Sequence, residues 1–209
     1  SIAKQANEIV KNDLIRTGEF YIFDEKSLIA YPPSEDDINY SDWRLINADY
    51  LLLTSVIESN SGIEARYEIF DVRKKSKIRS SKVYGVSNNV RQLSHYVSDG
   101  IYEAITGIQG VASTKILYVS QTNDLDASYR LYVADADGAN EQLLVKSPEP
   151  IISPAWSPDS KKVAYVSFET GIANVYIQDI STGERQSIIK KRCLTCITNE
   201  QISSPSWSP

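Results

Sequence analysis

Ser153-Pro154-Ala155-Trp156-Ser157-Pro158 returns near the end of the chain as Ser204-Pro205-Ser206-Trp207-Ser208-Pro209, at an offset of 51 residues. Two earlier stretches repeat in the same order. Residues 115–120 match residues 162–167 at an offset of 47, and residues 131–135 match residues 175–179 at an offset of 44. Short apolar runs separated by turn residues, recurring every ~40–50 residues, are typical of the blades of a β-propeller.

A propeller blade is a small twisted sheet that needs a neighbour on each side, and rings close at ~4–8 blades. Residues 113–209 hold about two blades and the start of a third. We therefore expect the chain to be a fragment that continues beyond Pro209; its opening, without an initiator Met or a signal segment, points the same way. Trp156 and Trp207 are predicted to pack between blades rather than to bind a ligand.

Residues 1–112 follow a different pattern, in which helical and strand-like periods alternate. Apolar residues at spacings of three and four predict two main helices, which end at Thr17-Gly18 and Thr106-Gly107. Ser87 is the expected N-cap of the second helix. Strands are predicted at residues 20–23, 48–57, 65–72 and 78–86, with a short helix that buries Trp43.

The predicted fold class is therefore an α/β N-terminal domain over residues 1–112, a mixed sheet with two main helices. An all-β propeller, truncated after about two blades, follows over residues 113–209. Hydrophobic residues make up 42% and charged residues 23% of the 209-residue chain, as in ordinary globular proteins. The net charge of −5 argues against nucleic acid as a partner. No apolar run approaches the ~18 residues that span a membrane.

Few side chains in the sequence could carry chemistry. His95 is the single histidine, and G-x-S-x-G, P-loop and G-x-G-x-x-G motifs are missing from the sequence. Arg91, His95, Asp99 and Glu103 lie four apart on one helix face, where neighbours can pair for about 0.2–0.5 kcal/mol each. His95 and Asp99 could form a catalytic dyad, but we favour a polar stripe at a helix edge or domain contact because no nucleophile accompanies them. We expect no catalytic, cofactor-binding or metal-binding residues.

Cys193-Leu194-Thr195-Cys196 lies in a polar segment where the repeat is longest. A C-x-x-C pair can be a redox centre, half of a zinc site or a local disulfide. A thioredoxin-type pair would begin a helix after a strand, and a zinc site would need further ligands. We favour a disulfide between Cys193 and Cys196, or two idle thiols.

Specific sequence motifs extend over nearly the whole chain. The strongest is the run 147–159, SPEPIISPAWSPD, followed by AYVSFE at 164–169; others are residues 12–20, Trp43 with residues 47–49, and the stripe from Arg91 to Gly107. By these motifs the chain resembles the TolB family, the periplasmic propeller proteins of the Tol–Pal system. It departs from the family pattern at Asn47 and Ser160, where glycine is usual.

The resemblance implies a scaffold rather than an enzyme, with an α/β domain on a six-bladed propeller and no cofactor. Such proteins bind the peptidoglycan-associated lipoprotein Pal through the propeller and TolA through their extreme N-terminus. The Tol–Pal system helps maintain the outer membrane and its constriction at division, and colicins exploit it during import. We expect the TolA-binding segment to precede Ser1. We also expect a monomer that associates with the membrane only through its partners.

Two other classes of protein fit the repeat. The propeller of a prolyl-oligopeptidase-like serine peptidase carries similar W-S-P-D repeats, and its hydrolase domain would follow Pro209. The α/β segment at the start argues against this class. A propeller could also bind a small ligand or metal in its central channel, which would require charged residues from further blades.

Overall fold

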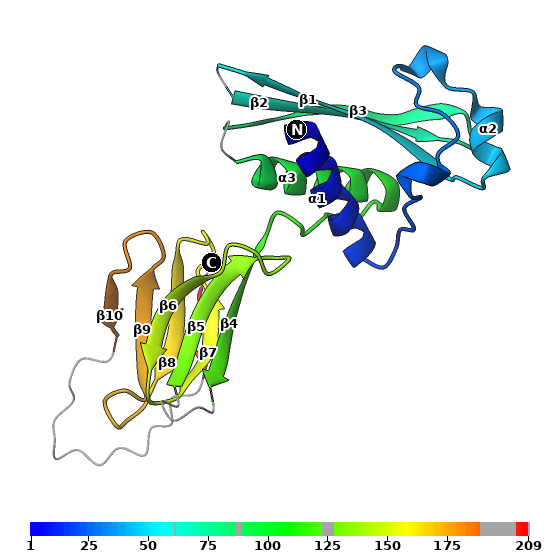
Figure 1. Cartoon of the computed structure of the whole chain (residues 1–209). Helices are drawn as coiled ribbons and strands as arrows, with labels where there is room; N and C mark the ends of the chain where they lie inside the picture. Colours follow the sequence, from blue (N-terminus) through cyan, green and yellow to red (C-terminus); the bar gives the residue numbers. More distant parts are fainter. Residues whose placement is uncertain (61, 87–88, 123–127, 189–203, 209) are drawn as a thin grey trace. The chain divides into compact units, whose positions relative to one another are not determined.

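The computed structural model describes residues 1–60, 62–86, 89–122, 128–188 and 204–208. They form two compact units, Ser1–Thr114 and Lys115–Pro209 (Figure 1). Within these described ranges, no helix is long and apolar enough to cross a membrane.

The first unit is a three-stranded sheet with helices. Its strands pair in the order β1-β2-β3, and each pair is antiparallel. Two short 3-10 helices, Glu25–Ser27 and Glu35–Asp37, lie in the connection before α2. The main elements are α1 (Ile2–Arg16), α2 (Tyr40–Leu45), β1 (Tyr50–Ser59), β2 (Gly62–Asp71), β3 (Ser76–Gly85) and α3 (Val90–Thr106).

The sheet of this unit differs from the prediction in two respects. It was expected to be mixed, but β1, β2 and β3 follow one another antiparallel. The segment 20–23, predicted as a strand, is not one. Its apolar side chains are used for packing instead: Phe20 and Ile22 contact the core beneath α1 and α3, while Phe23 contacts the core around Trp43. The run of apolar and aromatic residues at 20–23 therefore reflects packing into two separate cores and not a strand.

Both faces of the sheet are covered over part of its length. Alternate residues of β2, such as Ile63 and Ile69, pack with α1 and α3, which lie together on one face (Figure 1). On the other face, Leu51 and Phe70 pack around Trp43 of α2. The nearly continuous apolar run at the start of β1 packs into both cores, with Leu52 in one and Leu51 and Leu53 in the other, so this strand is covered on two sides.

Helix α3 begins two residues later than expected. Its N-cap is Asn89, whose side-chain oxygen accepts a hydrogen bond from the backbone N–H of Gln92 at 3.1 Å. Ser87, the predicted cap, lies outside the described residues. The helix ends as predicted, with Gly107 in the left-handed conformation that closes its last turn.

The second unit consists of two antiparallel sheets that follow the sequence repeat. The first sheet has the order β4-β5-β6 and the second the order β10-β9-β8-β7 (Figure 1). The strands are β4 (Lys115–Thr122), β5 (Ser128–Asp135), β6 (Gln142–Ser147), β7 (Ile151–Trp156), β8 (Lys162–Ser167), β9 (Asn174–Asp179) and β10 (Arg185–Ser187). An α/β unit followed by propeller blades confirms the predicted fold class.

One core joins the two blades. Leu131 and Val145 of the first sheet pack with Ile151 and Tyr165 of the second, and Trp156 packs against the same cluster, as predicted for a residue between blades. The segment that opens the next repeat lies against β7.

Trp207 makes that contact. Its indole N–H donates a hydrogen bond to the carbonyl oxygen of Ala155 at 3.3 Å. The pairing of β7 with β8 shifts register between Ile152 and Ala155, where Ser153 has φ +51°. Ser153 and Pro154, at the start of this blade, thus form a bulge in β7.

Candidate functional site

The polar stripe on α3 contains the residues that the sequence singled out for chemistry. In the structure, three of its four members contact three different partners outside the helix. His95 contacts Asp13 on α1, Asp99 binds the backbone beyond the helix, and Glu103 pairs with Arg79 on β3 at 3.1 Å. The stripe therefore fixes α3 to its surroundings within the first unit.

Asp13 is the centre of a buried polar cluster between α1 and α3. Its side chain is 2% exposed. Asp13 Oδ2 lies 2.6 Å from His95 Nδ1 and 2.8 Å from the Ser98 hydroxyl, and Oδ1 lies 3.0 Å from the Arg16 guanidinium. A carboxylate only accepts hydrogen bonds, so Nδ1 of His95 carries the proton of that contact. Each oxygen of this buried carboxylate is thereby supplied with donors.

The surroundings of Asp13 act on its pKa in both directions. Burial raises the pKa, because it removes the carboxylate from water. Hydrogen bonds from His95 and Ser98, and the electrostatic attraction of His95 and Arg16, lower it and outweigh burial. The pKa of Asp13 is therefore lowered from its usual value, and the cluster holds an ionised carboxylate.

Asp13, His95 and Ser98 are the residue types of a hydrolytic triad, but their arrangement differs from one. In a triad, histidine lies between the acid and the nucleophile and takes the proton of the serine hydroxyl. Here the Ser98 hydroxyl lies against Asp13 and, at 2.9 Å, against the Ser94 carbonyl. The other ring nitrogen of His95, Nε2, is buried and has no hydrogen-bond partner among the described residues. This geometry positions helices and does not activate a hydroxyl.

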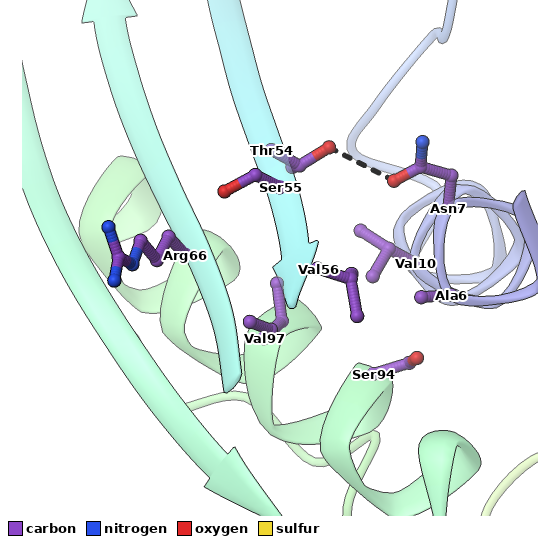
Figure 2. Close-up of a pocket in the computed structure, with 10 residues that line it drawn as sticks. Ala6, Asn7, Val10, Thr54, Ser55, Val56, Arg66, Ser94 and Val97 are labelled. Atoms are coloured by element: carbon purple, nitrogen blue, oxygen red, sulfur yellow. Dashed lines mark hydrogen bonds between the residues drawn. The ribbon is translucent and has the colours of Figure 1, made fainter. Parts of the chain in front are cut away.

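A small pocket lies between α1, α3, β1 and β2 (Figure 2). Its walls include Val10, Val56 and Val97. Among its polar groups, the Thr54 hydroxyl donates to the side-chain oxygen of Asn7 at 3.0 Å, so these two groups satisfy each other. We assign no ligand to the pocket, because specific sites combine an apolar wall with several convergent polar groups.

Asp13 and Ser98 were missed by the sequence reasoning as members of a site. A signal was present, because Asp13 follows Ala6 and Val10 at helical spacing and so lies on the apolar face of α1. A charged residue at such a position needs a partner from a neighbouring element. Cys193 and Cys196, for which a disulfide or two idle thiols are expected, lie outside the described residues.

Two family models match the chain. The TolB beta propeller domain matches residues 102–209, and the TolB amino-terminal domain matches residues 1–78. The matched ranges include the propeller motifs at residues 147–169 and the helical motif at residues 12–20, which carried the resemblance.

Individual relatives agree with the family models. The Tol-Pal system protein TolB of Hahella chejuensis is 39% identical over 190 residues, which cover 90% of this chain and 44% of the relative. The protein of the same name in Xylella fastidiosa is 38% identical over 188 residues, 89% of this chain and 43% of the relative. The chain thus spans less than half the length of these curated relatives.

A solved structure matches both sequence and fold. The crystal structure of TolB from Acinetobacter baumannii superposes with a TM-score of 0.81 at 38% identity, covering 88% of this chain and 46% of that chain. At this identity the likeness extends beyond the fold alone. With the propeller model matching residues 102–209, more than half of the sequence, the chain belongs to the TolB family.

Proposed function

We propose that this chain is part of a non-enzymatic scaffold of the Tol–Pal system that acts in the periplasm. In this proposal the whole protein binds Pal through its propeller and TolA through its extreme N-terminus. It thereby contributes to outer-membrane integrity and to constriction during division. The supporting observation is that the α/β segment and the propeller segment each match a TolB family model, in the family's order.

We also propose that residues 1–112 and 113–209 are two domains of this scaffold. The compact units Ser1–Thr114 and Lys115–Pro209 support this division. Two binding surfaces on two domains allow partners to influence each other's affinity, and any such coupling must be reciprocal.

The peptidase alternative receives no support from the first unit. Its propeller would precede a hydrolase domain and would not require an α/β domain in front. The match of residues 1–78 to the TolB amino-terminal domain therefore favours the scaffold. The Asp13 cluster adds to this argument, since its serine and histidine both face the carboxylate rather than each other.

Calorimetric titration tests the proposal. The chain, and a longer product of the same gene, are titrated with the soluble domain of the same organism's Pal-like lipoprotein. We expect binding at micromolar strength or tighter, about −8 kcal/mol or more favourable. Binding by the longer product alone also supports the proposal and assigns the contact to later blades. The absence of heat and of a complex with both forms would overturn it.

A matched control variant tests whether the binding seen in the titration is specific. Lys4 lies exposed in the first turn of α1, in the unit that the proposal does not assign to Pal. The variant Lys4→Glu is therefore expected to bind Pal with unchanged affinity. An unrelated soluble lipoprotein domain should give no heat with any form of the protein.

A further inference from the structure

The segment that leaves α3 folds back along the helix before β4 begins. Helix α3 ends at Thr106, and Gly107, with φ +74°, reverses the chain. Ala112 and Ser113 then contact the side chain of Asp99, which lies about two helical turns before the helix end. The chain therefore returns over α3 instead of passing directly into the propeller strands.

The Asp99 carboxylate holds this segment with both oxygens. The backbone N–H of Ala112 donates to Oδ1 at 2.6 Å, and that of Ser113 donates to Oδ2 at 3.0 Å. Hydrogen bonds to an ionised acceptor are stronger than those between neutral groups. One side chain thus captures two consecutive peptide groups.

Gly110 allows the close approach on which these bonds depend. A Cβ at this position would lie 2.4 Å from Asp99 Oδ1, 2.5 Å from its Cα and 2.8 Å from its Cβ. Because the Cα of a helix cannot move aside as a flexible side-chain end can, any larger residue must push the segment away from α3.

Apolar burial contributes little to holding the segment. Ile108 and Val111 are 62% and 67% exposed. The other hydrogen bonds described for residues 107–114 are local or close the helix end, such as Thr114 Oγ1 to the Val111 carbonyl at 2.7 Å. Asp99 is therefore the main described attachment of the segment to the body of α3.

We propose that Asp99 is a latch for the connection between the two units. When it is closed, it fixes the point at which the chain leaves α3 for β4. When it opens, residues 108–114 become free chain with a reach of about 23 Å. Opening breaks two hydrogen bonds and leaves the apolar core of the first unit, which contains Leu93 and Ile101, intact. The latch is thus a conformational device separate from the stability of either unit.

Amide hydrogen exchange tests the latch directly. In Asp99→Ala, exchange at Ala112 and Ser113 should become at least tenfold faster than in the wild type. Amides of α3 at Leu93 and Ile101 should remain protected, which shows that the unit is still folded. Unchanged exchange at Ala112 and Ser113 in a folded Asp99→Ala protein would overturn the proposal.

Glu103→Gln is the matched control. It lies one turn further along α3 and removes the charge of the Arg79–Glu103 ion pair without touching residues 108–114. Exchange at Ala112 and Ser113 should stay at the wild-type rate in this variant. Faster exchange there would mean that any charge change on α3 loosens the segment, which contradicts a specific role for Asp99.

A distance measurement tests the consequence for the two units. Nitroxide labels are attached at Glu8→Cys and Lys161→Cys in a chain that also carries Cys193→Ser and Cys196→Ser. Pulsed electron paramagnetic resonance then reports the distribution of distances between the two labels. Asp99→Ala and Gly110→Ala should both broaden it, and Glu103→Gln should not. If both Asp99→Ala and Gly110→Ala give the wild-type distance distribution, the proposal that Asp99 is a latch is overturned, even if the amides of Ala112 and Ser113 exchange faster.

Discussion

Asp13 Oδ2 and His95 Nδ1 lie 2.6 Å apart, although 82 residues separate them in the sequence. The contact joins the middle of α3 to the last turns of α1 inside the first unit. Around it, the two helices are otherwise held by apolar residues such as Val10 and Val97. A buried charge is tolerated here because donors from two helices surround it.

Asp13→Asn should destabilise the first unit by about 1.5–3 kcal/mol, because the charged acceptor of several buried donors is lost. Among the residues that the structure describes, the three α-helices all lie in this unit. Urea denaturation followed by helical circular dichroism therefore reports its stability. As a control, Asp24→Asn removes an 82% exposed carboxylate that lies 3.6 Å from Lys11 and should cost less than about 0.5 kcal/mol. Equal effects of the two variants would contradict the role of the cluster.

The contribution of Asp13 should disappear in acid. Its pKa in the folded protein lies below the usual 3.8, so the ionised form stabilises the fold at pH values above about 4. This stabilisation is lost as the pH falls through the folded-state pKa. Urea titrations between pH 2.5 and 7 should therefore show the wild type and Asp13→Asn converging at low pH. A stability difference that stays constant over this range would be evidence against the ionised cluster.

Ser160→Gly should stabilise the second unit by about 0.5–1 kcal/mol. Ser160 has φ +57°, a left-handed conformation that costs a residue with a Cβ about 1–2 kcal/mol. Glycine avoids this cost, but its greater flexibility stabilises the unfolded chain and cancels about half of the gain. Amide exchange in β8 measures the change. Asn47 also has φ +57°, but asparagine tolerates this region, so Asn47→Gly should change the helical unfolding midpoint little. A larger gain at Asn47 than at Ser160 would refute this explanation.

Gln178→Leu should weaken the contact between the two blades. The buried amide accepts from the Tyr165 hydroxyl at 3.2 Å and donates to the Leu144 carbonyl of the neighbouring sheet at 3.2 Å. Leucine leaves both groups without this partner, at a cost of about 1–3 kcal/mol. Faster amide exchange in β8 and β9 would show the loss. Gln186→Leu, at an exposed position on β10, is the control and should leave exchange there unchanged.

The fold was largely predictable because its signals are local and repeated. The period of the second half follows from matching short strands, and Trp156 lies where a blade anchor was expected. The helix ends at Gly107 and near Gly18 follow from the same local chemistry. The prediction of a strand at residues 20–23 was wrong, because a short run of apolar and aromatic residues does not show whether the backbone pairs with a neighbouring strand.

The polar cluster was only half predictable. The face shared by His95, Asp99 and Glu103 follows from helical geometry, but the partner of each depends on tertiary packing. Asp13 lies on another helix, and Ala112 contributes only its backbone N–H. Almost every residue has a backbone N–H, so the sequence does not show which of them will bind a given carboxylate. The attachment of residues 108–114 to α3 is therefore visible only in the structure.

The hydrogen bond from Trp207 to Ala155 connects positions 52 residues apart, across the boundary between one blade and the next. During synthesis, the Ala155 carbonyl can accept this hydrogen bond only after Trp207, in the following repeat, has left the ribosome. The blade that begins with β7 is thus completed by a segment made after it. A pause in translation between Pro158 and Trp207 would hold an unfinished edge open to solvent.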